Sequence, residues 1–104
     1  MRWKESTRVT ESIKKKTMPE LCRFLGIIIK MQFDDHDPPH IHVWYGGRHR
    51  AKVGILDGEV LWGNLPRPQL ACVTAWLIMH QMELAAAWQR ASHNKNPGKI
   101  PPLR

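Results

Sequence analysis

Residues 40–62, HIHVWYGGRHRAKVGILDGEVLW, decide the fold because they read as three short strands joined by two tight turns. Apolar and polar side chains alternate after His40, Gly46-Gly47 reverses the chain, and Asp57-Gly58 is typical of a two-residue hairpin turn. Consecutive strands with such short links pair with their neighbours in antiparallel order. The stretch therefore predicts a β-meander.

The segment before this stretch predicts one more strand, and the segment after it predicts a helix. Residues 21–33 are rich in Ile, Leu and Phe, as expected of a long first strand. After Pro68, apolar residues recur in steps of three or four, the period of an amphipathic helix of about 25 residues. These residues are Leu70, Val73, Leu77, Leu84, Trp88 and Ala91.

One face of this helix must cover the sheet, because a four-stranded meander cannot bury both of its own faces. We therefore expect an α+β fold, a four-stranded antiparallel β-meander packed against one long C-terminal α-helix. Trp62, Trp76 and Trp88 are expected in the core. Cys22 and Cys72 lie far apart among apolar neighbours, which predicts two buried thiols rather than a disulfide or a metal site.

The chain has 104 residues, enough for one domain with one core, and a net charge of +7. Residues 1–17 hold six Lys or Arg and two Glu, so they carry four of the seven net charges. We expect a flexible basic arm over residues 1–17, one α+β domain over residues 18–93 and a C-terminal tail over residues 94–104. No apolar run approaches the roughly 18 to 20 residues of a membrane span, which predicts a cytoplasmic protein that binds no membrane.

The run Asp35-His36-Asp37-Pro38-Pro39-His40-Ile41-His42 is the segment whose residue types suggest chemistry. Residues two apart on a strand share a face about 6.5 to 7 Å apart, so His40 and His42 are expected to face one site. His36 lies in the turn before them. His80 lies on the apolar stripe of the helix and needs a buried partner, for which the face of His40 and His42 is one candidate.

This cluster leaves three interpretations open. His40 and His42, with His36 and His80, are candidate acids and bases for RNA cleavage by a ribonuclease-type toxin. His40 and His42 with Asp35 or Asp37 are candidate ligands of a divalent metal, the only cofactor that the sequence leaves open. The third interpretation is structural, because histidines at turns often bond backbone groups.

A basic segment follows the His-x-His strand and suggests contact with RNA. Arg48, His49, Arg50 and Lys52 stand beside Trp44 and Tyr45, the mixture of charge and stacking surface that single-stranded nucleic acid favours. Lys14, Lys15 and Lys16 of the arm are further candidates for binding a polyanion. A solvated hairpin tip explains residues 47–50 equally well.

Taken together, several motifs resemble the small bacterial family known as domain of unknown function 4160. The resemblance spans roughly residues 18 to 92 and leaves the basic arm outside it. Its motifs are Pro19, Phe24, Gly26-Ile27, the run from Asp35 to His42, Tyr45-Gly46, Asp57-Gly58-Glu59-Val60-Leu61, Gly63-Asn64-Leu65-Pro66, and Trp76-x-x-x-His80-x-x-x-Leu84-x-x-x-Trp88.

The resemblance implies little chemistry, because members of this family are generally uncharacterised. Their genes often stand beside another small gene in what look like toxin–antitoxin pairs. We therefore expect a component of such a pair that acts on RNA through the His-x-His site, with RNA and a small cognate toxin or antitoxin as partners. The alternatives are a non-catalytic module that binds protein or nucleic acid, and a small metal-binding protein.

Overall fold

The computed structural model describes residues 18–103 as an α+β domain, in which a five-stranded antiparallel sheet is accompanied by two helices. Each strand pairs with the next one along the chain, so the sheet is the predicted meander with one more strand than expected. The strands are β1 (Glu20–Phe24), β2 (Ile27–Lys30), β3 (His40–Tyr45), β4 (His49–Gly54) and β5 (Val60–Gly63). The proposed basic arm, residues 1–17, lies outside the described residues.

The additional strand arises because residues 21–33 form a hairpin rather than one long strand. Leu25 has a φ of 51° and Gly26 a φ of 79°, and two successive positive φ values are the signature of a tight hairpin turn. The turn brings Phe24 opposite Ile27. The prediction of four strands was therefore one too few, because Leu25 gives no sign in the sequence of the left-handed backbone that it adopts.

The predicted long helix is two helices, α2 (Arg67–Met79) and α3 (Gln81–Ser92), which meet at 85°. His80 ends the first, because its backbone N–H is shared between the carbonyls of Trp76 and Leu77, and it starts the second by accepting a hydrogen bond from the amide of Leu84. The Gln81 side chain holds the corner by donating to the carbonyl of Ile55 at 3.1 Å.

The bend has a geometric reason. A straight helix of about 26 residues would be about 39 Å long, whereas five strands spaced about 4.8 Å apart span only about 19 Å. By bending, both halves keep an apolar face on the core. The buried helix residues are Val73, Trp76 and Leu77 of α2, and Leu84, Ala87, Trp88 and Ala91 of α3.

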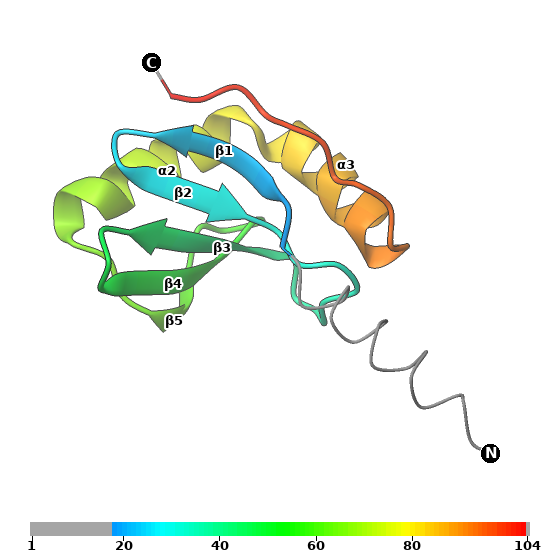
Figure 1. Cartoon of the computed structure of the whole chain (residues 1–104), viewed down its shortest axis with the longest axis horizontal. Coiled ribbons are helices and arrows are strands. Elements are labelled where there is room, and N and C mark those ends of the chain that lie inside the picture. Colours follow the sequence, from blue (N-terminus) through cyan, green and yellow to red (C-terminus); the bar gives the residue numbers. More distant parts are fainter. Residues whose placement is uncertain (1–17, 104) are drawn as a thin grey trace.

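In Figure 1, α2 passes behind the sheet and α3 continues beside β1, so the helices pack against one face of the sheet. The side chains that point towards them are fully buried and come mainly from alternate positions of the three central strands. They include Ile27, Ile29, Ile41, Val43, Ala51 and Val53. The chain beyond α3 returns along β1, where the amide of Ile100 donates to the carbonyl of Leu21 and the indole of Trp76 donates to the carbonyl of Pro101.

Most of the opposite face of the sheet is covered by no helix of the described chain (Figure 1), and only its end at His40 is reached by Trp88 of α3. Trp62 of β5 lies on this face with 54% of its surface exposed, which corrects the prediction that Trp62 is a core residue. β5 is an edge strand whose four residues are all exposed, so a large aromatic side chain there has nothing to pack under. Trp76 and Trp88 are buried as predicted.

Two remaining predictions concern the cysteines and the membrane. Cys22 is buried, Cys72 is half-buried, and both are free thiols. Within residues 18–103 no single helix is long and apolar enough to cross a membrane, although α2 and α3 together pass that test by length and composition.

Candidate functional site

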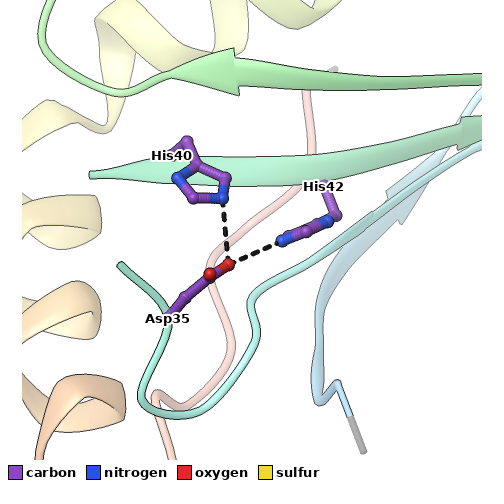
Figure 2. Close-up of side chains that lie close together, drawn as sticks. All are labelled: Asp35, His40 and His42. Atoms are coloured by element: carbon purple, nitrogen blue, oxygen red, sulfur yellow. Dashed lines mark hydrogen bonds and ion pairs between the residues drawn. The ribbon is translucent and has the colours of Figure 1, made fainter. Parts of the chain in front are cut away.

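The candidate site lies at the start of β3, where His40 and His42 project on the same side of the strand (Figure 2). The register places His42 between Lys30 of β2 and Lys52 of β4. The ring of His40 packs against that of Trp88 in α3, with the centroids 5.4 Å apart. The two imidazole centroids are 5.0 Å apart, so the predicted pairing of these histidines is present in the structure.

A carboxylate from the preceding loop joins the two rings. Asp35 lies in the connection between β2 and β3, and its Oδ2 is 2.9 Å from Nε2 of His40 and 3.0 Å from Nε2 of His42 (Figure 2). The amide of Asp34 donates to the carbonyl of Ala91, which ties this loop to the end of α3. The three side chains are 6%, 3% and 11% exposed for Asp35, His40 and His42, so the cluster is largely shielded from water.

The environment keeps Asp35 ionised. Burial by itself would raise the pKa of this carboxyl, but the hydrogen bond from His42, a hydrogen bond from the backbone N–H of His36 at 2.9 Å and the charges of His40 and His42 together lower it. The Oδ1 atom accepts the backbone bond, and Oδ2 faces the two imidazoles. The carboxylate is therefore an oriented anion.

In His42, burial outweighs the hydrogen bond to Asp35, and the pKa of the imidazole is lowered. Burial lowers the pKa of its imidazole, the hydrogen bond to Asp35 opposes that shift, and the charges of His40 and Lys52 lower the pKa further. A neutral ring is therefore favoured near pH 7. His40 is held differently, because its Nδ1 donates to the backbone carbonyl of Pro38 at 2.7 Å.

The other predicted members of the cluster do not all join it. His36 touches the Oδ1 atom of Asp35 at 3.2 Å, but its ring is 83% exposed. Asp37 is exposed and lies outside the group of potential metal-binding residues, which consists of Asp35, His40 and His42.

His80 lies at the corner between the helices, where its Nδ1 bonds to Glu83 and its ring packs on Trp76. The expected contact between His80 and the His40/His42 face is therefore absent among the described residues. His40 and His42 contact the carboxylate of Asp35, whereas His80 contacts that of Glu83. Sequence periodicity placed His80 on the inner stripe, but it could not reveal that the helix bends at this residue.

The predicted basic quartet is divided between different positions. Arg50 and Lys52 lie on the open face, where Arg50 is opposite Trp44, and Lys52 is opposite both His42 and Trp62. His49 alternates to the other side and packs against Tyr45, with centroids 6.2 Å apart. Arg48 is exposed in the turn between β3 and β4, and Lys14, Lys15 and Lys16 lie outside the described residues.

A groove of about 350 Å³ runs over this open face beside the histidine cluster. Sequence reasoning missed two of the side chains around it, Trp62 and Lys30. Lys30 lies with its Nζ 5.2 Å from the Trp44 ring, and the charged groups of Arg50 and Lys52 are 6.0 and 5.9 Å from the Trp62 ring. The alternation of side chains along a strand predicts the face on which Lys30 lies only when the register of β2 is known. That register depends on the hairpin turn at residues 25–26.

A family model for the domain of unknown function DUF4160 matches residues 26–89, which is more than half of the chain. The chain belongs to this family. The matched region contains β2 to β5, the Asp35–His40–His42 cluster, α2 and most of α3. No curated protein and no solved structure matches the chain. The DUF4160 match thus confirms the predicted resemblance, and the chemistry has to be argued from the geometry.

Proposed function

We propose that this protein binds single-stranded RNA on the open face of its sheet, as the RNA-binding component of a bacterial toxin–antitoxin module in the cytoplasm. The observation that carries the proposal is the pair Trp44 and Trp62, which both line the groove. Aromatic rings on an uncovered sheet are the stacking platforms on which proteins hold unpaired bases.

The charges around the two rings support a polyanionic ligand. Lys30, Arg50 and Lys52 surround the tryptophans, and none of the described residues that line the groove is acidic. Cations that now lie over the ring faces can turn to phosphates when bases take those faces. Stacking and phosphate contacts together give sequence-tolerant binding with a marked dependence on salt.

A single strand suits this surface better than a duplex. The bases of a duplex are stacked on one another, so their faces are not available to an aromatic side chain, whereas the bases of a single strand can splay onto Trp44 and Trp62. The five-stranded sheet supplies the rigid base that keeps the two rings in place. RNA is chosen over DNA because of the toxin–antitoxin role that the family resemblance implies.

Cleavage of the bound strand by His40 and His42 stays a prediction that the geometry does not favour. An acid–base pair has to reach the 2′-hydroxyl and the leaving oxygen. Only His42 lines the groove, while the His40 side chain is 3% exposed and both Nε2 atoms lie at Asp35. The proposal is therefore one of binding.

The test is fluorescence anisotropy with a labelled single-stranded oligoribonucleotide of about 12 residues. We expect Trp62→Ala to weaken binding about 5- to 150-fold, because stacking of one base contributes about 1 to 3 kcal/mol. Lys52→Gln should reduce the slope of log K against log salt by about 0.7 for each phosphate contact that is lost. Matched controls are Met82→Ala, which removes an 87% exposed apolar side chain elsewhere, and Lys95→Gln in the turn that follows α3.

The controls should bind like the parent protein. Equal losses in Trp62→Ala and Met82→Ala would contradict the proposal, as would the absence of any binding at low salt. A duplex RNA of the same length serves as the comparison ligand, and tighter binding to the duplex would point to a surface that reads the phosphate backbone rather than bases.

A second candidate function, pairing with the cognate protein of the module, is favoured by exposed apolar side chains at the corner between the helices. Ile78 and Met79 are each 64% exposed, Met82 is 87% exposed, and Leu56 beside Gln81 is 73% exposed. Clusters of this kind mark protein interfaces. Met82→Lys should abolish co-elution with the cognate protein of the module, whereas Trp62→Ala should leave it intact.

A further inference from the structure

The Asp35 carboxylate meets two imidazole nitrogens at one oxygen atom. Nε2 of His40 and Nε2 of His42 lie 2.9 and 3.0 Å from the same Oδ2 (Figure 2). Three potential ligand atoms therefore converge within a buried volume, and all of them lie within 4.8 Å of one another. His42 can meet Oδ2 through its Nε2–H, so the contact that needs an explanation is the one between Oδ2 and Nε2 of His40.

The hydrogen bonding of His40 defines which of its nitrogens carries the lone pair. Its Nδ1 lies 2.7 Å from the carbonyl oxygen of Pro38, and a carbonyl can only accept, so Nδ1 carries the hydrogen. In the neutral ring Nε2 is then a bare lone pair, and it faces an anionic oxygen. This nitrogen makes no well-directed hydrogen bond to any of the described residues, although it is buried.

Such an arrangement is what a metal-binding imidazole requires. Histidine ligands commonly donate their second nitrogen to a carbonyl, which fixes the ring orientation and the tautomer. The Pro38 carbonyl does this for His40, and the His36 amide holds Oδ1 of Asp35, so that Oδ2 remains directed at the two rings. Both supports come from the proline-containing loop that precedes β3.

The donor set and its dimensions agree with a transition metal. Two imidazoles and one carboxylate are a common three-ligand set for zinc, with bonds of about 2.0 to 2.2 Å, whereas magnesium and calcium prefer oxygen donors only. Tetrahedral bonds of that length separate the donor atoms by about 3.3 Å. The two N–O separations of 2.9 and 3.0 Å need to widen by a few tenths of an ångström, and the two Nε2 atoms, which lie within 4.8 Å of one another, need to reach the same spacing.

We propose that Nε2 of His40, Nε2 of His42 and Oδ2 of Asp35 bind one divalent transition-metal ion of the zinc class. The fourth position is left to a ligand from outside the cluster. His42 lines the groove on the open face, so an outside ligand can approach the cluster from the groove. The site goes beyond the proposed binding of RNA, because stacking on Trp44 and Trp62 needs no metal.

The test uses the full chain, purified without a histidine tag and stripped with a chelator. Calorimetric titration with Zn²⁺ should give one ion per chain, and Co²⁺ should bind with the visible absorption of a tetrahedral N/O site. A large excess of Mg²⁺ should not compete. Zn²⁺ should also raise the midpoint of thermal unfolding, because a ligand that binds only the folded state stabilises it.

His42→Ala and Asp35→Asn should each weaken Zn²⁺ binding at least about 100-fold. Loss of a residue that only hydrogen-bonds to a metal ligand already lowers metal affinity about 10- to 100-fold, and these two residues are the ligands themselves. His93→Ala is the matched control, because this exposed histidine at the end of α3 bonds to the carbonyl of Gln89 rather than to a residue of the cluster. Its affinity should stay within about threefold of the parent. Circular dichroism of each metal-free variant tests whether it is folded, and His42→Ala decides the test if Asp35→Asn does not fold.

Three outcomes would overturn the proposal. The first is a parent protein that binds no Zn²⁺. The second is undiminished binding in folded His42→Ala and Asp35→Asn. The third is loss of binding in His93→Ala alone, which would indicate a surface site. RNA binding is measured separately, so its failure and the failure of this proposal are distinguishable.

Discussion

Lys52 of β4 and Trp62 of β5 are cross-strand partners on the open face of the sheet, with the Lys52 ammonium 5.9 Å from the indole centroid. The same register places Lys52 opposite His42 on its other side. One row of side chains therefore links the histidine cluster with an exposed aromatic ring, and a ligand that stacks on Trp62 would lie beside the Asp35 cluster.

The two tryptophans Trp62 and Trp76 should respond very differently to truncation. Trp76 is fully buried, so Trp76→Ala should destabilise the fold by about 3 to 5 kcal/mol. Trp62 is 54% exposed on an edge strand, and Trp62→Ala should cost less than about 1 kcal/mol. Urea unfolding curves of the two variants measure the difference, and similar losses would show that Trp62 packs in solution.

Gly63 should tolerate no side chain. Its φ is +77°, and an added Cβ would lie 2.1 Å from the carbonyl oxygen of Arg50, which is part of the neighbouring strand. Gly63→Ala should therefore destabilise the domain by more than about 2 kcal/mol, because left-handed strain and displacement of β4 add together. Gly47→Ala is the control, since nothing lies within 4 Å of its added Cβ. Thermal unfolding of both variants provides the comparison.

The C-terminal segment should loosen when one hydrogen bond is removed. The Trp76 indole donates to the Pro101 carbonyl at 2.7 Å, and Trp76→Phe keeps most of the buried ring but removes this donor. We expect a loss of about 1 kcal/mol and faster hydrogen exchange at the amide of Ile100, which bonds to Leu21. Exchange in the centre of β3 should stay slow, and uniform acceleration would instead indicate global destabilisation.

Stability of the metal-free protein should fall as the pH is lowered. The pKa values of His42 and Asp35 are both below their ordinary values, so the unfolded chain binds protons first and acid favours unfolding. The loss should begin as the pH falls below about 6.5, where an unfolded histidine is protonated, and continue below about 4 for Asp35. Urea midpoints between pH 8 and 3.5, measured with a chelator, give the profile.

Two variants separate these contributions. His42→Gln should flatten the part of the profile near pH 6, and Asp35→Asn should flatten the part near pH 4, because each removes one group whose pKa differs between the folded and unfolded states. Stability that rises between pH 7 and pH 5 would contradict the expected sign.

Local patterns in the sequence were sufficient for much of the fold. The Gly46-Gly47 and Asp57-Gly58 turns and the alternation of β3 predicted an antiparallel meander, and the apolar spacing of residues 70–91 predicted helix against sheet. These signals depend only on nearby residues, so they can be read without knowing the fold. The turn at Leu25 is marked only by Gly26, which a bulge within one strand would explain equally well, and the bend at His80 is marked by neither glycine nor proline. Both depend on what the segment packs against.

The sequence by itself determined that His40 and His42 share one side of a strand, because the side-chain period of a strand is two. Tertiary structure alone decided the rest of the site. It brought Asp35 back onto both Nε2 atoms, sent His80 to Glu83 instead, and left Trp62 exposed beside Lys52. These outcomes depend on loop closure, on the helix bend and on which strand forms the edge of the sheet, and each of these is settled by the packing of the whole domain.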